Sequence, residues 1–299
     1  MARTFPSDVL VLDDDALVHA RLGRGKRDPR IVQAKSYRLA DDTFTSAVVS
    51  PELTNEASLT EAVRRMKGET GRWDKASLLL PDSWFRINLV DLPSLPDRSA
   101  EALEMVRWSL KRTLPLAPES LRVAYEVLSR DAAKGARVLV LSAVETTLQS
   151  LERVFGAAGI ELVLIEPIGI NIWNAITVRE NETGTNRIFV YVRENDFTTA
   201  VFQGAQPLFI RSRNLSGERT LQQELRLSAS YLRDSMAGEL FAQCYVAGNR
   251  VDGEVHDTLA REFNTQVRSI HLRDFVEDVP LGATGYEAEL TACTGVFTG

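Results

Sequence analysis

The sequence predicts an α/β protein with a duplicated core and a smaller subdomain inserted into the first copy. Two stretches, at about residues 9–80 and 188–246, show the same order of elements, β-β-β-α-β. Between them, residues 84–166 show a different order, β-α-β-β-α-β, which is typical of a compact split crossover unit. With 299 residues, the chain is also long enough for two domains.

The first copy begins with a hairpin whose turn is a run of three aspartates, Asp13 to Asp15. A helix follows the third strand. Ser58 is expected to cap this helix, and Glu61 completes a capping box three residues later. An apolar run that ends at Pro81 then predicts a buried strand. The expected strands span 9–12, 16–22, 31–39 and 76–80, and the apolar helix face comprises Leu59, Ala62, Val63 and Met66.

The inserted stretch is organised around one helix and the strand that follows it. Asp97 can cap this helix, and Pro115 stops it because an internal proline loses a hydrogen bond and clashes with the preceding turn. Trp108 lies off the apolar face, so we expect it to point at a partner or at another element. The helix face comprises Leu103, Val106, Leu110 and Leu114. The other expected elements are strands at 87–92, 123–127, 137–142 and 162–165 and a helix at 144–155.

The second copy follows a helix that Pro167 is expected to open at its first position. Three strands come next, and Gly204 is expected to turn the second of their two hairpins. Ser216–Glu218 is expected to start a long helix with one apolar face. The expected strands span 188–192, 198–202, 207–213, 242–246 and 267–271, with a further helix at 251–263.

Two copies of this order, with a foreign subdomain after the fourth strand of the first copy, are the plan of the actin-like (ribonuclease H-like) fold. In such a fold two mixed sheets face each other across a cleft, and helices pack outside them. We expect the first half to cover residues 1–183, with the inserted subdomain at about 84–166. The second half is expected to cover residues 184–299.

The composition argues against several classes of function. The net charge of −6 disfavours a nucleic-acid-binding protein, which usually has a basic domain or stripe. Cys244 and Cys293 lie in apolar segments, so we expect reduced core residues in a cytoplasmic protein. The three histidines are far apart in sequence and there is no close cysteine pair, so no metal site is expected. No apolar run is long enough to span a membrane, and the N-terminus lacks the apolar core of a signal peptide.

Three groups of short motifs occur in a consistent order between about residues 87 and 250. They are DLPSLP at 91–96, LPLAPE at 114–119 and YEVL at 125–128; then VLVLSA at 138–143, AAG at 157–159 and EP at 166–167; then 188–202, PLFIR at 207–211 and Gly217. In these motifs the chain resembles the type IV pilus assembly protein PilM family. It resembles the cytoplasmic domain of the type II secretion protein GspL more distantly. Leu116 stands where the PilM family usually has Phe.

The resemblance implies a place on the cytoplasmic face of the inner membrane, where family members bind the N-terminal tail of a membrane protein, PilN. A short extended segment of a PilN-like partner is then expected to dock between the first subdomain and the inserted one. Other pilus or secretion assembly components are expected as further partners. Trp108 also fits a core position, since aromatic residues are enriched both in cores and at interaction centres. The candidate contact residues are Trp108, Lys111, Arg112, Leu114 and Pro115.

The resemblance also implies a nucleotide site in the two hairpin turns, one in each half. Such turns need a small residue, so that backbone N–H groups can approach the phosphate, and an Asp ahead of it to hold the metal through its water. The family pattern resembles Asp-Ile-Gly in both halves. Here the matching residues are Val11-Leu12-Asp13 followed by Asp14, and Tyr191-Val192-Arg193 followed closely by Asn195. The adenosine-side loop keeps one glycine, in Gly248-Asn249.

These losses predict a non-catalytic scaffold of a type IV pilus or a related type II secretion machine, with no cofactor. The acids at 13–15 are either a solvated turn or a relocated Mg²⁺ site. The alternative function is an active actin-like ATPase that uses Mg-ATP to couple nucleotide state to pilus assembly. A third hypothesis, a sugar kinase of the same fold, lacks a visible catalytic Asp and Gly-rich loops. The basic residues at 24–30 are either a solvated loop or a contact for anionic lipid heads.

Overall fold

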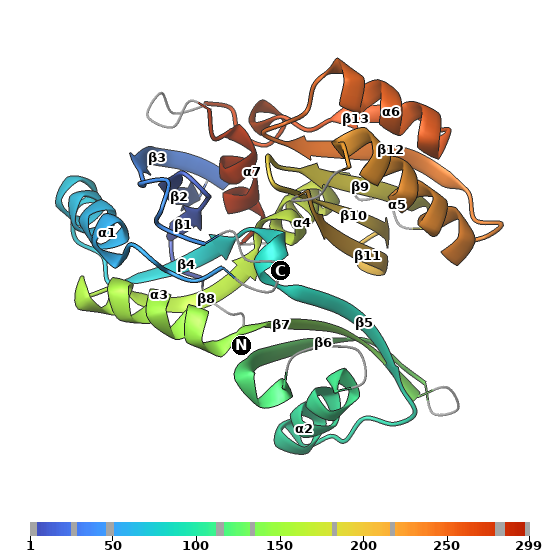
Figure 1. Ribbon diagram of the computed structural model, residues 1–299, viewed down its shortest axis with the longest axis horizontal. Helices are drawn as coiled ribbons and strands as arrows, with labels where there is room; N and C mark the ends of the chain where they lie inside the picture. The colour runs from blue at the N-terminus through green and yellow to red at the C-terminus, as the bar shows by residue number, and fades with distance from the viewer. Residues whose placement is uncertain are drawn as a thin grey trace.

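The computed structural model describes residues 5–24, 29–45, 51–111, 117–131, 135–180, 184–215, 219–278 and 285–296 of the chain. Within these residues, the strands form two five-stranded sheets and one three-stranded sheet. Helices α4 (Ile168–Glu180) and α7 (Glu287–Gly295) lie between the two large sheets, and the small sheet stands apart from them (Figure 1).

The two large sheets have matching topologies. Their strand orders are β3-β2-β1-β4-β8 and β11-β10-β9-β12-β13. In each, the first strand pairs antiparallel with the second and parallel with the fourth, so the predicted duplication is confirmed. The strands are β1 (Asp8–Leu12), β2 (Ala16–Arg24), β3 (Pro29–Arg38), β4 (Lys75–Leu80), β8 (Glu161–Pro167), β9 (Asn186–Val192), β10 (Asp196–Gln203), β11 (Gln206–Asn214), β12 (Phe241–Gly248) and β13 (Val267–Ser269).

The central strands are buried because both faces of each large sheet are covered. Val9 and Val11 of β1 pack into the core between the sheets, whereas Leu10 and Leu12 pack outward. In that shared core α4 and α7 pack closely, and a Cβ added at Gly295 would overlap the carbonyl oxygen of Asn171. The outer helices are α1 (Glu56–Thr70) and α3 (Glu145–Ala157) on the first sheet, and α5 (Leu221–Ser235) and α6 (Gly253–Phe263) on the second.

The inserted sheet is smaller than the sequence predicts. Its strands are β5 (Arg86–Leu92), β7 (Gly135–Val144) and β6 (Leu121–Asp131), in that order, and α2 (Ser99–Leu110) packs on one face. The last two elements of the predicted β-α-β-β-α-β unit join the first half instead: β8 pairs in parallel with β4, and α3 packs in the same core as α1. The order of elements along a chain does not say which sheet a strand joins, so the unit is corrected to β-α-β-β.

Two helix starts differ from the prediction because other side chains make the local hydrogen bonds. Asn55 rather than Ser58 caps α1, and its side-chain oxygen accepts from the backbone N–H of Ser58 at 3.1 Å. No side chain caps α2. Asp97, the predicted cap, instead accepts a hydrogen bond from Arg130 at 2.7 Å.

The second half shows three further differences. A capping box of Thr220 and Gln223 starts α5, and the predicted start at residues 216–218 lies outside the described residues. Pro167 ends β8, so α4 begins one residue later than predicted. The sequence does not predict α7, because nearly every residue of this helix is buried and no polar face marks its period.

Two remaining predictions concern the cysteines and the membrane. Cys244 and Cys293 are both buried and free, as predicted for reduced core residues. Among the described residues, no helix combines the length and the apolar character needed to cross a membrane.

Candidate functional site

The two hairpin turns identified in the sequence have the same backbone geometry. After β1, the N–H of Asp13 donates to the carbonyl of Ala16 at 2.9 Å; after β9, the N–H of Arg193 donates to the carbonyl of Asp196 at 2.8 Å. Asp13 and Arg193 therefore hold equivalent positions in the two halves. Their side chains are in contact, so the two turns face each other across the cleft between the sheets.

The guanidinium group of Arg193 links the two turns. This side chain is 1% exposed and forms ion pairs with Asp13, with Asp14 at 3.1 Å and with Asp196 at 2.7 Å. Asn195 adds a hydrogen bond to Asp14 at 3.1 Å. Removing one member of a buried ion network leaves the others without a counter-charge, which is costly. The network therefore ties the first half to the second.

Two more carboxyl groups lie buried beside this network. Burial raises the pKa of Asp82 to about 6, although its carboxylate accepts a hydrogen bond from the N–H of Gly169 at 2.7 Å. Burial, together with the negative charge of Asp13, raises the pKa of Glu289 to about 8. Glu289 therefore keeps its proton to a higher pH than an exposed glutamate does. The cleft holds more acids than cations.

This arrangement fits a phosphate poorly. Arg193 fills the space between the turns, and its charge is matched by three carboxylates, which leaves little positive charge there to attract an anion. Val11 and Tyr191, which stand where the family pattern has its metal-holding acid, are fully buried in the core between the sheets. In the part of the chain that the structure describes, no three carboxylate, thiol or imidazole side chains are arranged to hold a metal ion.

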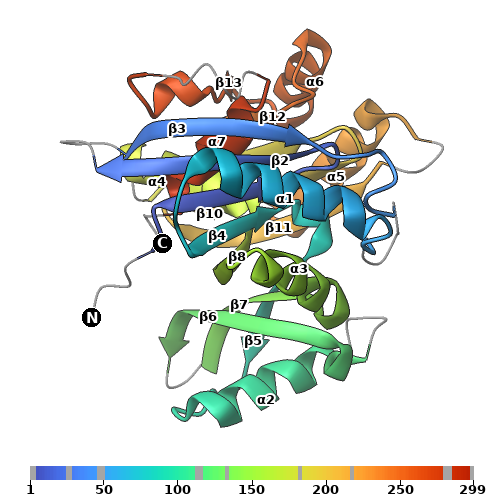
Figure 2. The same ribbon diagram turned by 90° about the vertical axis from the view of Figure 1, so that its left-hand side faces the viewer.

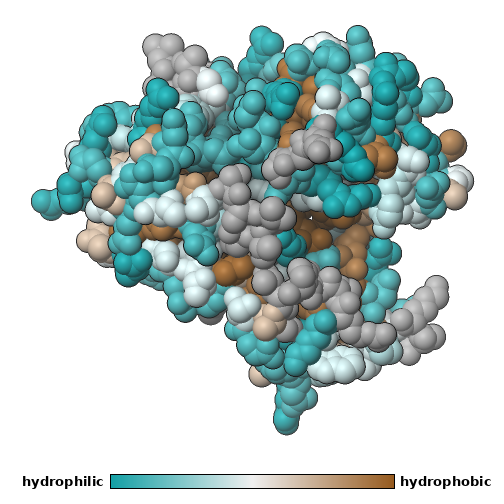
Figure 3. Space-filling view, in the orientation of Figure 1, coloured by the Kyte–Doolittle hydropathy of each residue, from teal (hydrophilic) through white to brown (hydrophobic). Residues whose placement is uncertain are grey.

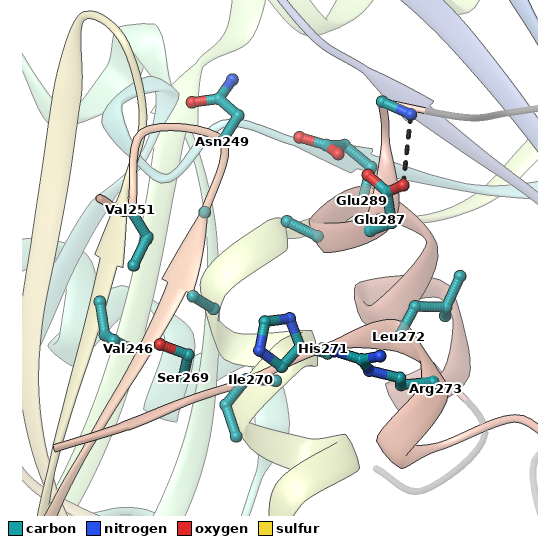
Figure 4. Close-up of a pocket in the computed structure, with 14 residues that line it drawn as sticks. Val246, Asn249, Val251, Ser269, Ile270, His271, Leu272, Arg273, Glu287 and Glu289 are labelled. Atoms are coloured by element: carbon teal, nitrogen blue, oxygen red, sulfur yellow. Dashed lines mark hydrogen bonds between the residues drawn. The ribbon is translucent and has the colours of Figure 1, made fainter. Parts of the chain in front are cut away.

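A cavity of about 420 Å³ remains on the predicted adenosine side of the cleft. Gly248 and Asn249 line it, and Glu287 and Glu289 face it from α7 (Figure 4). Gly248 has a φ of 135°, and an added Cβ would overlap the carbonyl oxygen of Val192 on β9. Glycine is therefore required here by the packing of β12 against β9, whether or not a ligand binds.

The sequence alone does not single out three acids of this cleft. Asp196 carries a weak signal, because it lies three residues after Arg193 at the start of a strand. Asp82 follows Pro81 directly after a central strand, where polar residues of α/β sheets often gather. Glu289 carries no signal, because its helix is not predicted.

The predicted partner-binding residues lie on and after α2. Trp108 is 65% exposed, so the core alternative for this residue is wrong. Beside it, Lys111 pairs with Glu119 at 3.4 Å, and the three residues border a cavity of about 230 Å³. The remaining candidates lie outside the described residues: Arg112, Leu114 and Pro115.

The second face of the small sheet looks toward the second half of the molecule. Figures 1 and 2 show α2 on the side of this sheet that points away from the rest of the molecule. Leu89, Leu139 and Leu141 alternate with the residues that pack against α2, so they point to the opposite face. That face looks toward β11, since Arg137 donates to the carbonyl of Leu208 at 3.2 Å. Figure 3 shows hydrophobic residues in a hollow between the insert and the second half.

Comparison with solved structures shows the fold. The chain matches a chain of the PilM–PilN type IV pilus biogenesis complex with a TM-score of 0.80 and 16% identity, covering 99% of this chain and 98% of that one. It also matches a Bacteroides thetaiotaomicron protein with an actin-like ATPase fold (TM-score 0.57, 11% identity, 95% of each chain). A third match is the cytoplasmic domain of EpsL, an inner-membrane component of the Vibrio cholerae type II secretion system (TM-score 0.56, 12% identity, 98% of this chain and 94% of that one).

These similarities confirm the predicted actin-like fold and the likeness to PilM and to the secretion protein at the level of structure. No family model matches the sequence, and no curated protein matches it significantly. At these identities the comparisons establish the fold alone.

Proposed function

We propose that this chain is a non-catalytic scaffold of a type IV pilus, or of a related type II secretion machine, that binds the N-terminal tail of a PilN-like inner-membrane protein. The observation that carries the proposal is the similarity over 99% of the chain to a member of the PilM–PilN complex. In this proposal the protein lies on the cytoplasmic face of the inner membrane, held there by its partner and by other assembly components.

The cleft supports a role without catalysis. Phosphoryl transfer depends on cations, metal ions and backbone N–H groups that hold the phosphates and stabilise their charge. Here the buried cation between the turns, Arg193, is already neutralised by three carboxylates. Val11 and Tyr191 supply no carboxylate where the metal-holding acids would stand.

The face of the small sheet that looks toward β11 is the better of two docking surfaces for an extended tail, because Leu89 and Leu141 are only half-buried there. Leu89 and Leu139 lie directly opposite each other on β5 and β7, and Leu141 follows two residues later. A tail that lies in the hollow beside them would bury apolar side chains on both of its sides. Trp108, on the far side of the sheet, is the second candidate, because a large exposed aromatic side chain often anchors a partner.

One observation favours the alternative, an active actin-like ATPase: a cavity of about 420 Å³ remains beside Gly248 and Asn249. For Mg-ATP to bind there, its phosphates must displace Arg193 from Asp13 and Asp14. The alternative therefore requires the ion network to open, at the cost of leaving buried charges without partners.

Isothermal titration calorimetry separates the two functions. The full chain is titrated first with a synthetic peptide that carries the N-terminal tail of a PilN-like protein, and then with Mg-ATP. We expect the tail to bind without nucleotide and millimolar Mg-ATP to give neither heat nor released phosphate. A micromolar constant for Mg-ATP with matching turnover would establish the ATPase instead. If the folded chain does not bind the tail, the scaffold proposal is wrong.

A further inference from the structure

A separate surface lies where α5 crosses the edge strand β11. Phe209, Arg211 and Arg213 alternate along β11 and share one face, beside Leu227 and Tyr231 of α5. We call these five residues the α5–β11 surface. The rings of Phe209 and Tyr231 lie 5.8 Å apart, and the guanidinium of Arg211 lies 4.3 Å from the centre of the Tyr231 ring. Leu227 is 45% and Tyr231 50% exposed, so large apolar side chains remain open to solvent here.

The two arginines of this surface lack acidic partners. Within the described residues neither forms an ion pair, and Nη1 of Arg211 is buried without a hydrogen-bond acceptor. Burial, and then the like charge of Arg213, lower the pKa of Arg211. By contrast, Arg226 on the α6 side of the same helix pairs with Glu262 at 3.3 Å. Glu224 acts on the pKa of Arg211 in the opposite direction, but it forms its ion pair with Arg219, so this surface keeps an excess of positive charge.

These features specify the chemistry of an occupant. The guanidinium groups of Arg211 and Arg213 offer N–H donors to a carboxylate, which can bind a guanidinium group through a charge-assisted, two-point hydrogen bond. The exposed side chains of Leu227 and Tyr231 lie next to the cations, so an apolar side chain of the occupant can pack on them. A free phosphate or a metabolite anion has no such side chain.

We propose that the α5–β11 surface binds an acidic segment of a protein partner. Asp or Glu side chains of the segment pair with Arg211 and Arg213, and a neighbouring aromatic or aliphatic side chain packs on Leu227 and Tyr231. This contact is independent of the tail-binding site and of the cleft. It would let the chain hold a second component of an assembly while its first partner is bound.

A random 12-residue peptide library displayed on phage provides the probe. Peptides are selected on the full wild-type chain and counter-selected on the Arg211→Glu, Arg213→Glu double variant. We expect the survivors to carry Asp or Glu next to an aromatic or aliphatic residue. Fluorescence anisotropy should then show a dissociation constant at least tenfold weaker for the double variant, and weaker binding at higher salt. Arg226→Glu, a charge reversal elsewhere on α5, should leave the constant unchanged.

Three results would overturn the proposal. One is a selection that yields no binders or binders without acidic enrichment. Another is equal affinity of the selected peptides for the wild-type chain and the double variant. The third is a wild-type chain that binds no acidic peptide but binds vesicles containing phosphatidylglycerol, with that vesicle binding lost in the double variant. The surface would then be a contact for lipid. The Arg211→Gln, Arg213→Gln variant, checked by circular dichroism and thermal unfolding, separates loss of the cations from misfolding.

Discussion

Asp13 and Arg193 occupy the same place in two related hairpin turns, and their side chains form an ion pair across the cleft. If both turns served one anion, the two positions should share the same chemistry. Here one position holds an acid and the other a base. The charges of the two turns therefore match each other and do not match a shared anion. This relation underlies the proposal that the cleft is structural.

Replacing Arg193 with methionine is expected to lower the free energy of unfolding by about 3–5 kcal/mol, because three buried or half-buried acids lose their counter-charge. Urea denaturation followed by circular dichroism measures the loss. Arg219→Met is the matched control: Arg219 is exposed and pairs with Glu224 at 3.2 Å, so its loss should be below about 1 kcal/mol. Similar losses for the two variants would show that the buried network contributes little.

The stability of the protein should fall as the pH rises through the range in which two buried acids ionise. The pKa of Asp82 is raised from 3.8 to about 6, and that of Glu289 from 4.5 to about 8. A raised pKa in the folded state means that this state binds more protons than the unfolded chain. The free energy of unfolding therefore decreases from about pH 4 to about pH 8, and for Asp82 alone the change is on the order of 3 kcal/mol.

The variant Asp82→Asn tests whether Asp82 causes part of this slope of the free energy of unfolding against pH. The variant keeps an oxygen that can accept from Gly169 but has no proton to lose, so the part of the slope between about pH 4 and 6 should disappear. Asp97→Asn, at a side chain that is 96% exposed, should leave the slope as it is. Urea denaturation at several pH values gives both profiles. If the free energy of unfolding of Asp82→Asn still falls between about pH 4 and 6, groups other than Asp82 cause that fall.

Two glycine-to-alanine changes should have opposite signs. At Gly169 an added Cβ would overlap the buried carboxylate of Asp82, so Gly169→Ala should destabilise the fold by about 1–3 kcal/mol. At Gly68, within α1, nothing lies within 4 Å of an added Cβ. Gly68→Ala should therefore stabilise the fold by about 0.5–1 kcal/mol. Thermal unfolding of the two variants is the measurement, and a gain in stability from Gly169→Ala would mean that Asp82 does not pack against α4.

The two faces of the small sheet can be told apart by variants. Leu89→Gln with Leu141→Gln should weaken binding of the PilN-like tail by at least tenfold, because the apolar hollow becomes polar. Trp108→Ala, on the opposite face, should leave the affinity unchanged. Calorimetry with the tail peptide and a check of thermal unfolding decide the matter. The reverse result would move the docking site to α2.

The strand order of the two halves could be predicted because it depends on local patterns. Asp13–Asp15 and Gly204 mark turns, and the buried strands carry continuous apolar runs. The sequence could not predict which sheet β8 joins, because the order of elements along the chain does not determine which distant strands pair. Helix α7 could not be predicted either, because burial on all sides erases its amphipathic period.

The candidate site was only partly visible in the sequence. Arg193 and Asp13 stand out because each replaces a small residue in a recognisable turn. Their pairing depends on how the halves approach each other, which no local pattern encodes. Asp82 and Glu289 reach the same cleft from a 3₁₀ helix and from the last described helix, far from either turn in the chain. The second face of the small sheet was likewise hidden, since alternation alone does not show which element that face looks toward.

The close packing of α4 against α7 at Gly295 limits how the molecule can move. Helix α7 follows the second sheet in the chain, yet it packs beside β1 and β2 of the first sheet as well as against α4. The end of the second half is thereby anchored in the first half, and we expect the two halves to move little relative to each other.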